Sequence, residues 1–154
     1  MSGSGLRAPC ALGRSGIRAR KREGDGATPL GVFRLLRVYY RPDRVQRPRT
    51  GLPVIRLRPA DGWCDAGADR NYNRPVELPY PASCEQMWRS DDVYDIVVVL
   101  SHNTRPRKRG AGSAIFMHIA RPGYSPTEGC IALSRRDLLA VLARCGRSTT
   151  MRIV

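Results

Sequence analysis

Cys130 and His118 are the two residues of this chain whose types and spacing best suit chemistry. Cys130 follows a glycine in SPTEGCIALS, residues 125–134, and His118 stands upstream in AIFMHIA, residues 114–120. A cysteine attacks as its thiolate, and its ordinary pKa of about 8.5 means that it needs help at neutral pH. A neighbouring histidine gives this help, either as a base or as an imidazolium partner. The pair therefore predicts a cysteine nucleophile, provided that the fold brings the two side chains together.

Two residues beside the cysteine fit this hypothesis. Gly129 allows a sharp turn, so that the backbone amides of residues 129 and 130 can bind an oxyanion. Thr127 can hydrogen-bond the histidine or cap the loop. The plainer interpretation is that Cys130 is a small core residue and His118 a satisfied strand histidine. Composition alone favours this second interpretation, because the chain has five cysteines and apolar residues follow Cys130.

The surrounding pattern predicts mainly β structure. Apolar residues in strand-like runs, bounded by turn residues, occupy residues 32–40, 52–59, 94–103, 113–120, 130–134 and 149–154. A helix is expected over residues 134–146, with Ser134 as N-cap, Asp137 in the first turn and Gly146 as terminator. The strand that carries His118 and the strand that begins at Cys130 are expected to lie side by side.

The fold class that follows is a β-sandwich or open barrel of mixed sheets with one α-helix in the C-terminal half. Residues 60–85 are predicted to be mostly loop and residues 84–90 a helical turn. Such a long ordered loop often carries function. A chain of 154 residues suffices for one domain. We assign residues 1–11 to a flexible N-terminus or expression tail and residues 12–154 to a single catalytic domain.

The net charge of the chain limits the kinds of molecule that it is expected to bind. There are 27 Lys and Arg residues against 13 Asp and Glu, which gives a net charge of +14. Such a charge attracts polyanions: nucleic acid, an acidic wall polymer or an anionic membrane surface. No apolar run approaches the roughly 18 residues of a membrane span, and no secretory signal is visible. With two histidines and no CxxC spacing, no metal site is expected.

Three segments together resemble the L,D-transpeptidase catalytic domain, the YkuD-like family of peptidoglycan enzymes. His118 in FMHIA and the segment TEGCIAL, residues 127–133, match the histidine strand and the Ser/Thr-x-Gly-Cys motif of that family. The segment GDGATPLGVF, residues 24–33, matches the Thr-Pro-x-Gly turn that precedes an aromatic strand position. The resemblance covers roughly residues 12–154.

The resemblance implies a cysteine-dependent L,D-transpeptidase that needs no cofactor and works in the periplasm or cell wall. Cys130 would form a thioester with a donor stem peptide, and an amine of an acceptor stem would resolve it into a cross-link. His118 would move the proton. The donor would be diaminopimelate at stem position three or, in a variant, the first stem residue.

Three departures from the family pattern concern the substrate site. The loop from His118 to Cys130 is shorter than usual, Glu128 replaces a common histidine, and Ala132 replaces an arginine that helps to bind a substrate carboxylate. We therefore expect other residues to bind the substrate. The candidates are Arg121, the loop residues Arg70, Tyr72 and Arg74, and the pair His102 and Asn103 after the buried strand.

Two other functions compete with transpeptidation. A carboxypeptidase or amidase would hydrolyse the same thioester. A basic nucleic-acid-binding module would use the net charge alone. We expect no nucleic-acid partner, because the arginines are scattered and no known nucleic-acid motif occurs.

Overall fold

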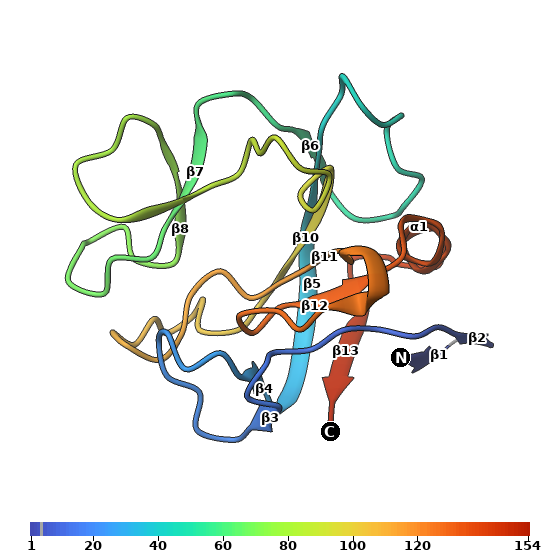
Figure 1. Ribbon diagram of the computed structural model, residues 1–154, viewed down its shortest axis with the longest axis horizontal. Coiled ribbons are helices and arrows are strands. Elements are labelled where there is room, and N and C mark those ends of the chain that lie inside the picture. Colours follow the sequence, from blue (N-terminus) through green and yellow to red (C-terminus); the bar gives the residue numbers. More distant parts are fainter. Residues whose placement is uncertain (4) are drawn as a thin grey trace.

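A computed structural model describes residues 1–3 and 5–154 (Figure 1). The central sheet has six strands in the order β12-β11-β10-β5-β13, with β6 also paired to β5. Its strands are β5 (Gly31–Tyr40), β6 (Val54–Arg56), β10 (Ile96–Leu100), β11 (Phe116–Ile119), β12 (Ile131–Leu133) and β13 (Thr150–Ile153). The pairs β11–β12 and β5–β6 are parallel, whereas β10 pairs with both neighbours in antiparallel fashion. The predicted strands at these places are confirmed.

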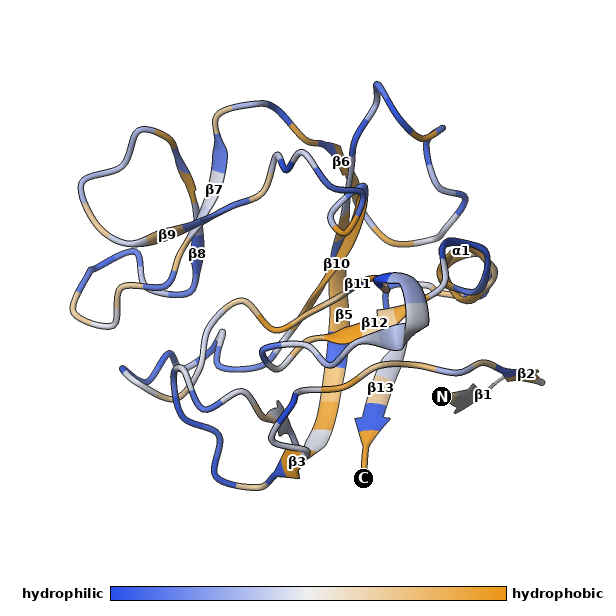
Figure 2. Cartoon of the chain, viewed as in Figure 1, coloured by the Kyte–Doolittle hydropathy of each residue, from blue (hydrophilic) through white to orange (hydrophobic). Residues whose placement is uncertain are grey.

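The sheet is buried on both faces because its central strands, β10 and β11, are apolar at every position except His118. All five residues of β10 and all four of β11 are buried. Side chains alternate between the faces, so Val97, Val99 and Phe116 point to one side while Ile96, Val98 and Met117 point to the other. Figure 2 shows the hydrophobic colouring along these strands and the hydrophilic colouring of the outer loops.

Helix α1 (Arg135–Leu142) covers one face of the sheet. Ser134 is its N-cap, as predicted, and accepts a hydrogen bond from the amide of Asp137 at 3.1 Å. Leu138 and Leu142 are fully buried against the strands. The helix ends earlier than predicted, since the last turn before Gly146 is not helical.

A small three-stranded sheet covers the other face, with strand order β8-β7-β9. It consists of β7 (Asp61–Cys64), β8 (Arg74–Glu77) and β9 (Cys84–Gln86). In Figure 1 it lies on the opposite side of the central strands from α1. The helical turn predicted at 84–90 is therefore wrong, because Cys84–Gln86 is strand β9, whereas residues 60–85 are mostly loop as predicted but also contain β7 and β8. The strands are only three or four residues long, and the surrounding Gly, Asp and Pro residues hid their pattern.

The N-terminal residues run along the edge of the central sheet. Short pairs β1 (Ser2–Gly3) with β2 (Leu6–Arg7) and β3 (Ile17–Arg18) with β4 (Thr28–Pro29) lie here. Ala8 and Ala11 are buried, and Ala11 bridges to Ala132. A 3₁₀ turn, η1 (Pro122–Tyr124), follows β11. The mainly β class with one α-helix is confirmed; the described residues form open sheets and no closed barrel.

Candidate active site

Strands β11 and β12 bring Cys130 and His118 to the same face of the central sheet. The parallel register pairs His118 with Ala132, and Cys130 lies two residues before Ala132. Residues two apart share a face, so the cysteine and the histidine are diagonal neighbours, with Cα atoms about 7–8 Å apart. Phe116, two residues before His118, donates its amide hydrogen to Cys130 Sγ at 3.4 Å. The two residues therefore lie on one face of the sheet, as a catalytic pair requires, and their joint role stays a prediction.

The loop before Cys130 is held by the N-terminal segment of residues 11–14. Thr127 donates its amide hydrogen to Leu12 O at 2.9 Å and accepts one from Arg14 N at 2.8 Å. Ala132 and Ala11 exchange two backbone hydrogen bonds, at 2.9 and 2.8 Å. A chain segment more than 110 residues away thus fixes both ends of the loop that presents the thiol.

Gly129 is required where it stands. Its φ of +133° lies in the region open to glycine, and a Cβ there would come within 2.7 Å of Ala27 O. Thr127 caps the turn: its hydroxyl donates to Cys130 O at 2.6 Å and accepts from the Gly129 amide at 3.2 Å. The Gly129 amide hydrogen is therefore already bonded to the Thr127 hydroxyl. To bind an oxyanion, this amide would have to break that 3.2 Å hydrogen bond or share its hydrogen between the two acceptors.

Cys130 is held as a neutral thiol in this structure. Its side chain lies in an apolar cluster with Phe116 and Tyr94, and the residue is only 8% exposed. Burial raises the pKa of Cys130 to about 12. The thiol donates to Ala114 O at 3.2 Å, which further suits the protonated form.

His118 is held as a neutral imidazole. It is 6% exposed, and burial lowers its pKa to about 4, with the nearby guanidinium groups of Arg121 and Arg89 adding to the effect. Its Nδ1 lies 2.9 Å from Ile119 O. Since a carbonyl only accepts, Nδ1 carries the hydrogen, and Nε2 keeps its lone pair. The imidazole therefore keeps one ring nitrogen that can accept a proton.

The small sheet of β7, β8 and β9 covers the face of the central sheet on which Cys130 and His118 lie. Trp63 of β7 packs edge-on against Phe116, with ring centroids 5.0 Å apart. Tyr94 packs edge-on against His118 at 5.4 Å, and its hydroxyl donates to the carboxylate of Glu85 in β9. Burial raises the pKa of both Tyr94 and Glu85. The sequence analysis missed Glu85 and Tyr94, because a lone carboxylate in a presumed helical turn gave no signal.

Asn73 links this sheet to the cysteine. Its Oδ1 accepts from Trp63 Nε1 at 3.0 Å and from the amide of Ala114 at 3.1 Å, and Ala114 O is the acceptor for the thiol. Its Nδ2 donates to His102 O at 3.2 Å and Asn103 O at 2.9 Å. Asn73 lies in the loop that carries the candidates Arg70, Tyr72 and Arg74, but the sequence did not single it out.

The predicted substrate residues fall into two groups. Arg121 is 55% exposed at its side chain and lies close enough to His118 to affect its pKa. Arg70 and Arg74 are exposed on the small sheet and its loop, and Arg74 faces the basic loop that carries Arg107. Arg121 is therefore the candidate arginine nearest the pair.

The side chains of the other three candidates, Tyr72, His102 and Asn103, hold neighbouring loops in place. Tyr72 is 3% exposed and donates its hydroxyl hydrogen to Glu23. His102 Nε2 contacts Ala111 O at 2.9 Å, and its ring packs edge-on against Phe33. The Asn103 side chain bonds the backbone of Lys108 and of Gly112.

Two of the three departures from the family pattern, Ala132 and Glu128, are explained by their local contacts. Ala132 is 1% exposed and lies against Ala11, so this position has no room for an arginine. Glu128 is exposed and forms an ion pair with Arg14, which ties the cysteine loop to the N-terminal segment. The substrate charge must therefore be met by residues outside this motif.

The described residues contain neither a cluster of metal ligands nor a helix that could span a membrane. No group of three or more His, Cys, Asp or Glu side chains is placed to hold a metal ion there. In the same part of the chain, the only α-helix, with eight residues, is too short to cross a membrane.

Comparison with known proteins agrees with this geometry. The profile of the L,D-transpeptidase catalytic domain family, YkuD, matches residues 2–153. No curated protein and no solved structure gave a match. Because the matched region spans nearly the whole chain, and contains the histidine strand and the Gly-Cys turn, the protein belongs to the YkuD family of L,D-transpeptidase catalytic domains, which act on peptidoglycan.

Proposed function

We propose that this protein cross-links peptidoglycan stem peptides through a thioester on Cys130, with His118 as the base. The observation that carries the proposal is the placement of these two residues on neighbouring parallel strands, on one enclosed face of the sheet. No other cysteine of the described chain has a histidine on an adjoining strand position.

The neutral state of both groups supports a base-assisted attack. As Cys130 Sγ attacks the donor carbonyl carbon, His118 Nε2 accepts the thiol proton. The carbon–nitrogen bond to the leaving amine then breaks, and the same imidazole returns the proton to that nitrogen. The thioester retains the energy of the cleaved amide. An acceptor amine attacks the thioester carbonyl, His118 takes the surplus proton, and the thiol is released.

The enclosed site favours transfer over hydrolysis. Cys130 lies among Tyr94, Phe116 and Trp63, and the small sheet covers this face. Such surroundings exclude bulk water from an acyl-enzyme. The carboxypeptidase and amidase alternatives require water at the same carbonyl and remain outcomes of the test below.

Arg121 is the residue we assign to the substrate carboxylate in place of the family arginine. It is exposed beside His118 and bound only loosely to Asp91, at 3.9 Å. Arg70 and Arg74 are assigned to the outer wall of the substrate site, and Tyr72, His102 and Asn103 to the loops that support this wall. The donor is diaminopimelate at stem position three or the first stem residue, and Ala132 makes the second donor a serious alternative.

The test is product analysis by mass spectrometry after mixing the full chain with purified disaccharide-tetrapeptide. A dimer that has lost one D-alanine is expected from the wild type and from Cys10→Ser, a matched cysteine variant remote from the site. Cys130→Ala and His118→Gln should give none. A dimer of another mass would assign the first-residue donor, shortened monomer alone would assign a hydrolase, and unchanged substrate would contradict the proposal.

A further inference from the structure

Cys64 and Cys84 face each other across the small sheet. They are register partners on the antiparallel strands β7 and β9. The neighbouring bonds Asp65 N to Ser83 O and Met87 N to Asp61 O mark the hydrogen-bonded positions of this ladder. The positions alternate, so Cys64 and Cys84 form a non-hydrogen-bonded pair.

This kind of pair brings side chains closest. Its Cα atoms are typically about 4.5 Å apart, and a disulfide spans Cα distances of about 4.4–6.8 Å. Both side chains point to the same side of the ladder because they are register partners. A bond between the two sulfur atoms therefore requires no change in strand pairing.

The two thiols already interact in the reduced form. The pKa of Cys84 is raised to about 11, first by burial and then by the Cys64 thiol, to which it is hydrogen-bonded. Cys64 is fully buried, whereas Cys84 is partly exposed. An oxidant can thus reach Cys84, and Cys64 is placed to complete the bond.

The position of the pair connects it to the candidate active site. Cys64 adjoins Trp63, which packs on Phe116, and Cys84 adjoins Glu85, which accepts a hydrogen bond from Tyr94, whose ring packs on His118. A bond between the two cysteines would join the two strands that make these contacts. It would also close the loop that carries Asn73.

We propose that Cys64 and Cys84 form a disulfide that fixes the small sheet over the Cys130–His118 site when the protein meets an oxidising compartment. The thiolate of Cys84 attacks a disulfide oxidant and displaces one of its thiolates. The thiolate of Cys64 then attacks the mixed disulfide and displaces the second. Two thiols of the protein become one disulfide, and the oxidant leaves as two thiols that carry the two protons.

The oxidising compartment follows from the proposed function, since disulfides persist outside the cytoplasm. The bond itself is measured without any reference to activity. If the disulfide forms but no transpeptidation is detected, only the proposed function is contradicted. If the enzyme is active after oxidation but carries no Cys64–Cys84 disulfide, only the present inference is contradicted.

The experiment exposes the full chain to oxidised glutathione, blocks the remaining thiols with iodoacetamide, and maps peptides without reduction. The expected result is a linked Cys64–Cys84 peptide pair, with Cys10 and Cys145 alkylated. Free, alkylated Cys64 and Cys84 after oxidation, or a bridge to another cysteine, would overturn the proposal.

Thermal unfolding provides a second measurement. The oxidised wild type should lose roughly 6–12 °C of Tm when dithiothreitol is added. Cys10→Ser should show the same loss, whereas Cys64→Ser and Cys84→Ser should show none. An equal Tm for the oxidised and reduced wild type would contradict a bond that fastens the small sheet.

Discussion

At the scale of single residues, the site combines a thiol and an imidazole that burial keeps uncharged. The pKa of Cys130 is raised to about 12 and that of His118 is lowered to about 4. Between these two values of pH, the thiol is protonated and the imidazole is neutral. The free protein therefore holds no thiolate–imidazolium pair at neutral pH, and in the proposed mechanism the proton moves as a substrate carbonyl is attacked.

This state predicts how Cys130 reacts with iodoacetamide as pH changes. Only the thiolate reacts, and its fraction rises with pH until the pH reaches the pKa. The alkylation rate of Cys130 should therefore rise about tenfold per pH unit from pH 7 to 10, with no plateau. The rate is followed by mass spectrometry of the peptide that contains Cys130.

Glutathione in the same solution is the control, and its rate should level off as its own thiol ionises near pH 8.5 to 9. A plateau of the Cys130 rate below pH 7, abolished in His118→Gln, would instead show an ion pair in the free protein. That result would replace base-assisted attack by attack of a preformed thiolate.

The central pair could be predicted from the sequence, but its surroundings could not. Cys130 and His118 are recognisable because their types, order and strand context are restrictive. Glu85 and Tyr94 approach the pair only through pairing of β9 with β7 and packing of rings across the sheet. Such long-range contacts leave no spacing signal in the chain.

At the scale of elements, the Asn73 side chain links the small sheet to the site, in addition to the Trp63–Phe116 packing and the Tyr94–Glu85 hydrogen bond. Asn73 connects Trp63 of β7, the carbonyls of residues 102 and 103, and the amide of Ala114. Its φ of +55° is tolerated by asparagine better than by most residues. The same residue therefore shapes the turn before β8 and positions the acceptor of the Cys130 thiol.

Replacing Asn73 by Ala should destabilise the protein by about 2–4 kcal/mol, because the indole of Trp63 and the amide of Ala114 lose a buried acceptor. Urea unfolding measures this loss. Alkylation of Cys130 should also become several-fold faster, since the backbone that holds the thiol is released. Asn73→Gly should lose the same hydrogen bonds while relieving the strain of positive φ.

Asn71→Ala is the matched control, since Asn71 lies in the same loop and bonds only Tyr80 through its side-chain amide. It should change stability by less than about 1 kcal/mol and leave Cys130 alkylation unchanged. Equal effects of the two alanine variants on Cys130 would contradict a specific positioning role for Asn73.

Composition, more than length, decided which strands could be predicted. β10 and β11 consist mostly of apolar residues, β5 carries a long run of them, and the helix has a cap and an amphipathic pattern, so each was found. β7 (DGWC), β8 (RPVE) and β9 (CEQ) contain a glycine, a proline and charged residues, which interrupt any apolar run. Their pairing with one another, rather than any local preference, holds them in the strand conformation.

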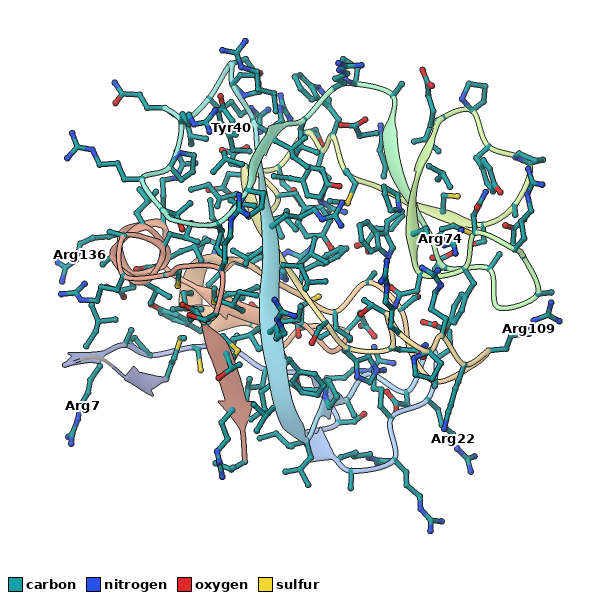
Figure 3. The ribbon with its side chains drawn as sticks, turned by 180° about the vertical axis from the view of Figure 1, so that it is seen from behind. Arg7, Arg22, Tyr40, Arg74, Arg109 and Arg136 are labelled. Carbon is teal, nitrogen blue, oxygen red and sulfur yellow. The ribbon has the colours of Figure 1, made fainter. Side chains whose placement is uncertain are left out.

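At the scale of the whole molecule, positive charge surrounds the fold. The net charge is +14, and the labelled Arg7, Arg22, Arg109 and Arg136 point outward along different edges of the molecule in Figure 3. Positive charge that is spread over the whole surface attracts an extended anionic polymer, but it does not fix the position along the polymer at which the protein binds. This fits a wall polymer whose stem peptides carry free carboxylates.

The double variant Arg7→Glu/Arg136→Glu tests this interpretation far from Cys130. Each reversal removes one positive charge and adds one negative charge, so the net charge falls from +14 to +10. Both arginines are exposed, and neither takes part in the site. At low salt, where the Debye length is about 30 Å, the variant should bind isolated sacculi roughly tenfold more weakly than wild type.

At about 1 M salt the Debye length falls to roughly 3 Å, so the two proteins should bind sacculi alike. The turnover rate at saturating substrate should be the same throughout, because the charges act on encounter and not on the thioester chemistry. Cys130→Ala keeps the charge and should bind as the wild type does. Salt-sensitive binding to a DNA duplex that exceeds binding to sacculi under the same conditions would mean that the charge serves a nucleic acid.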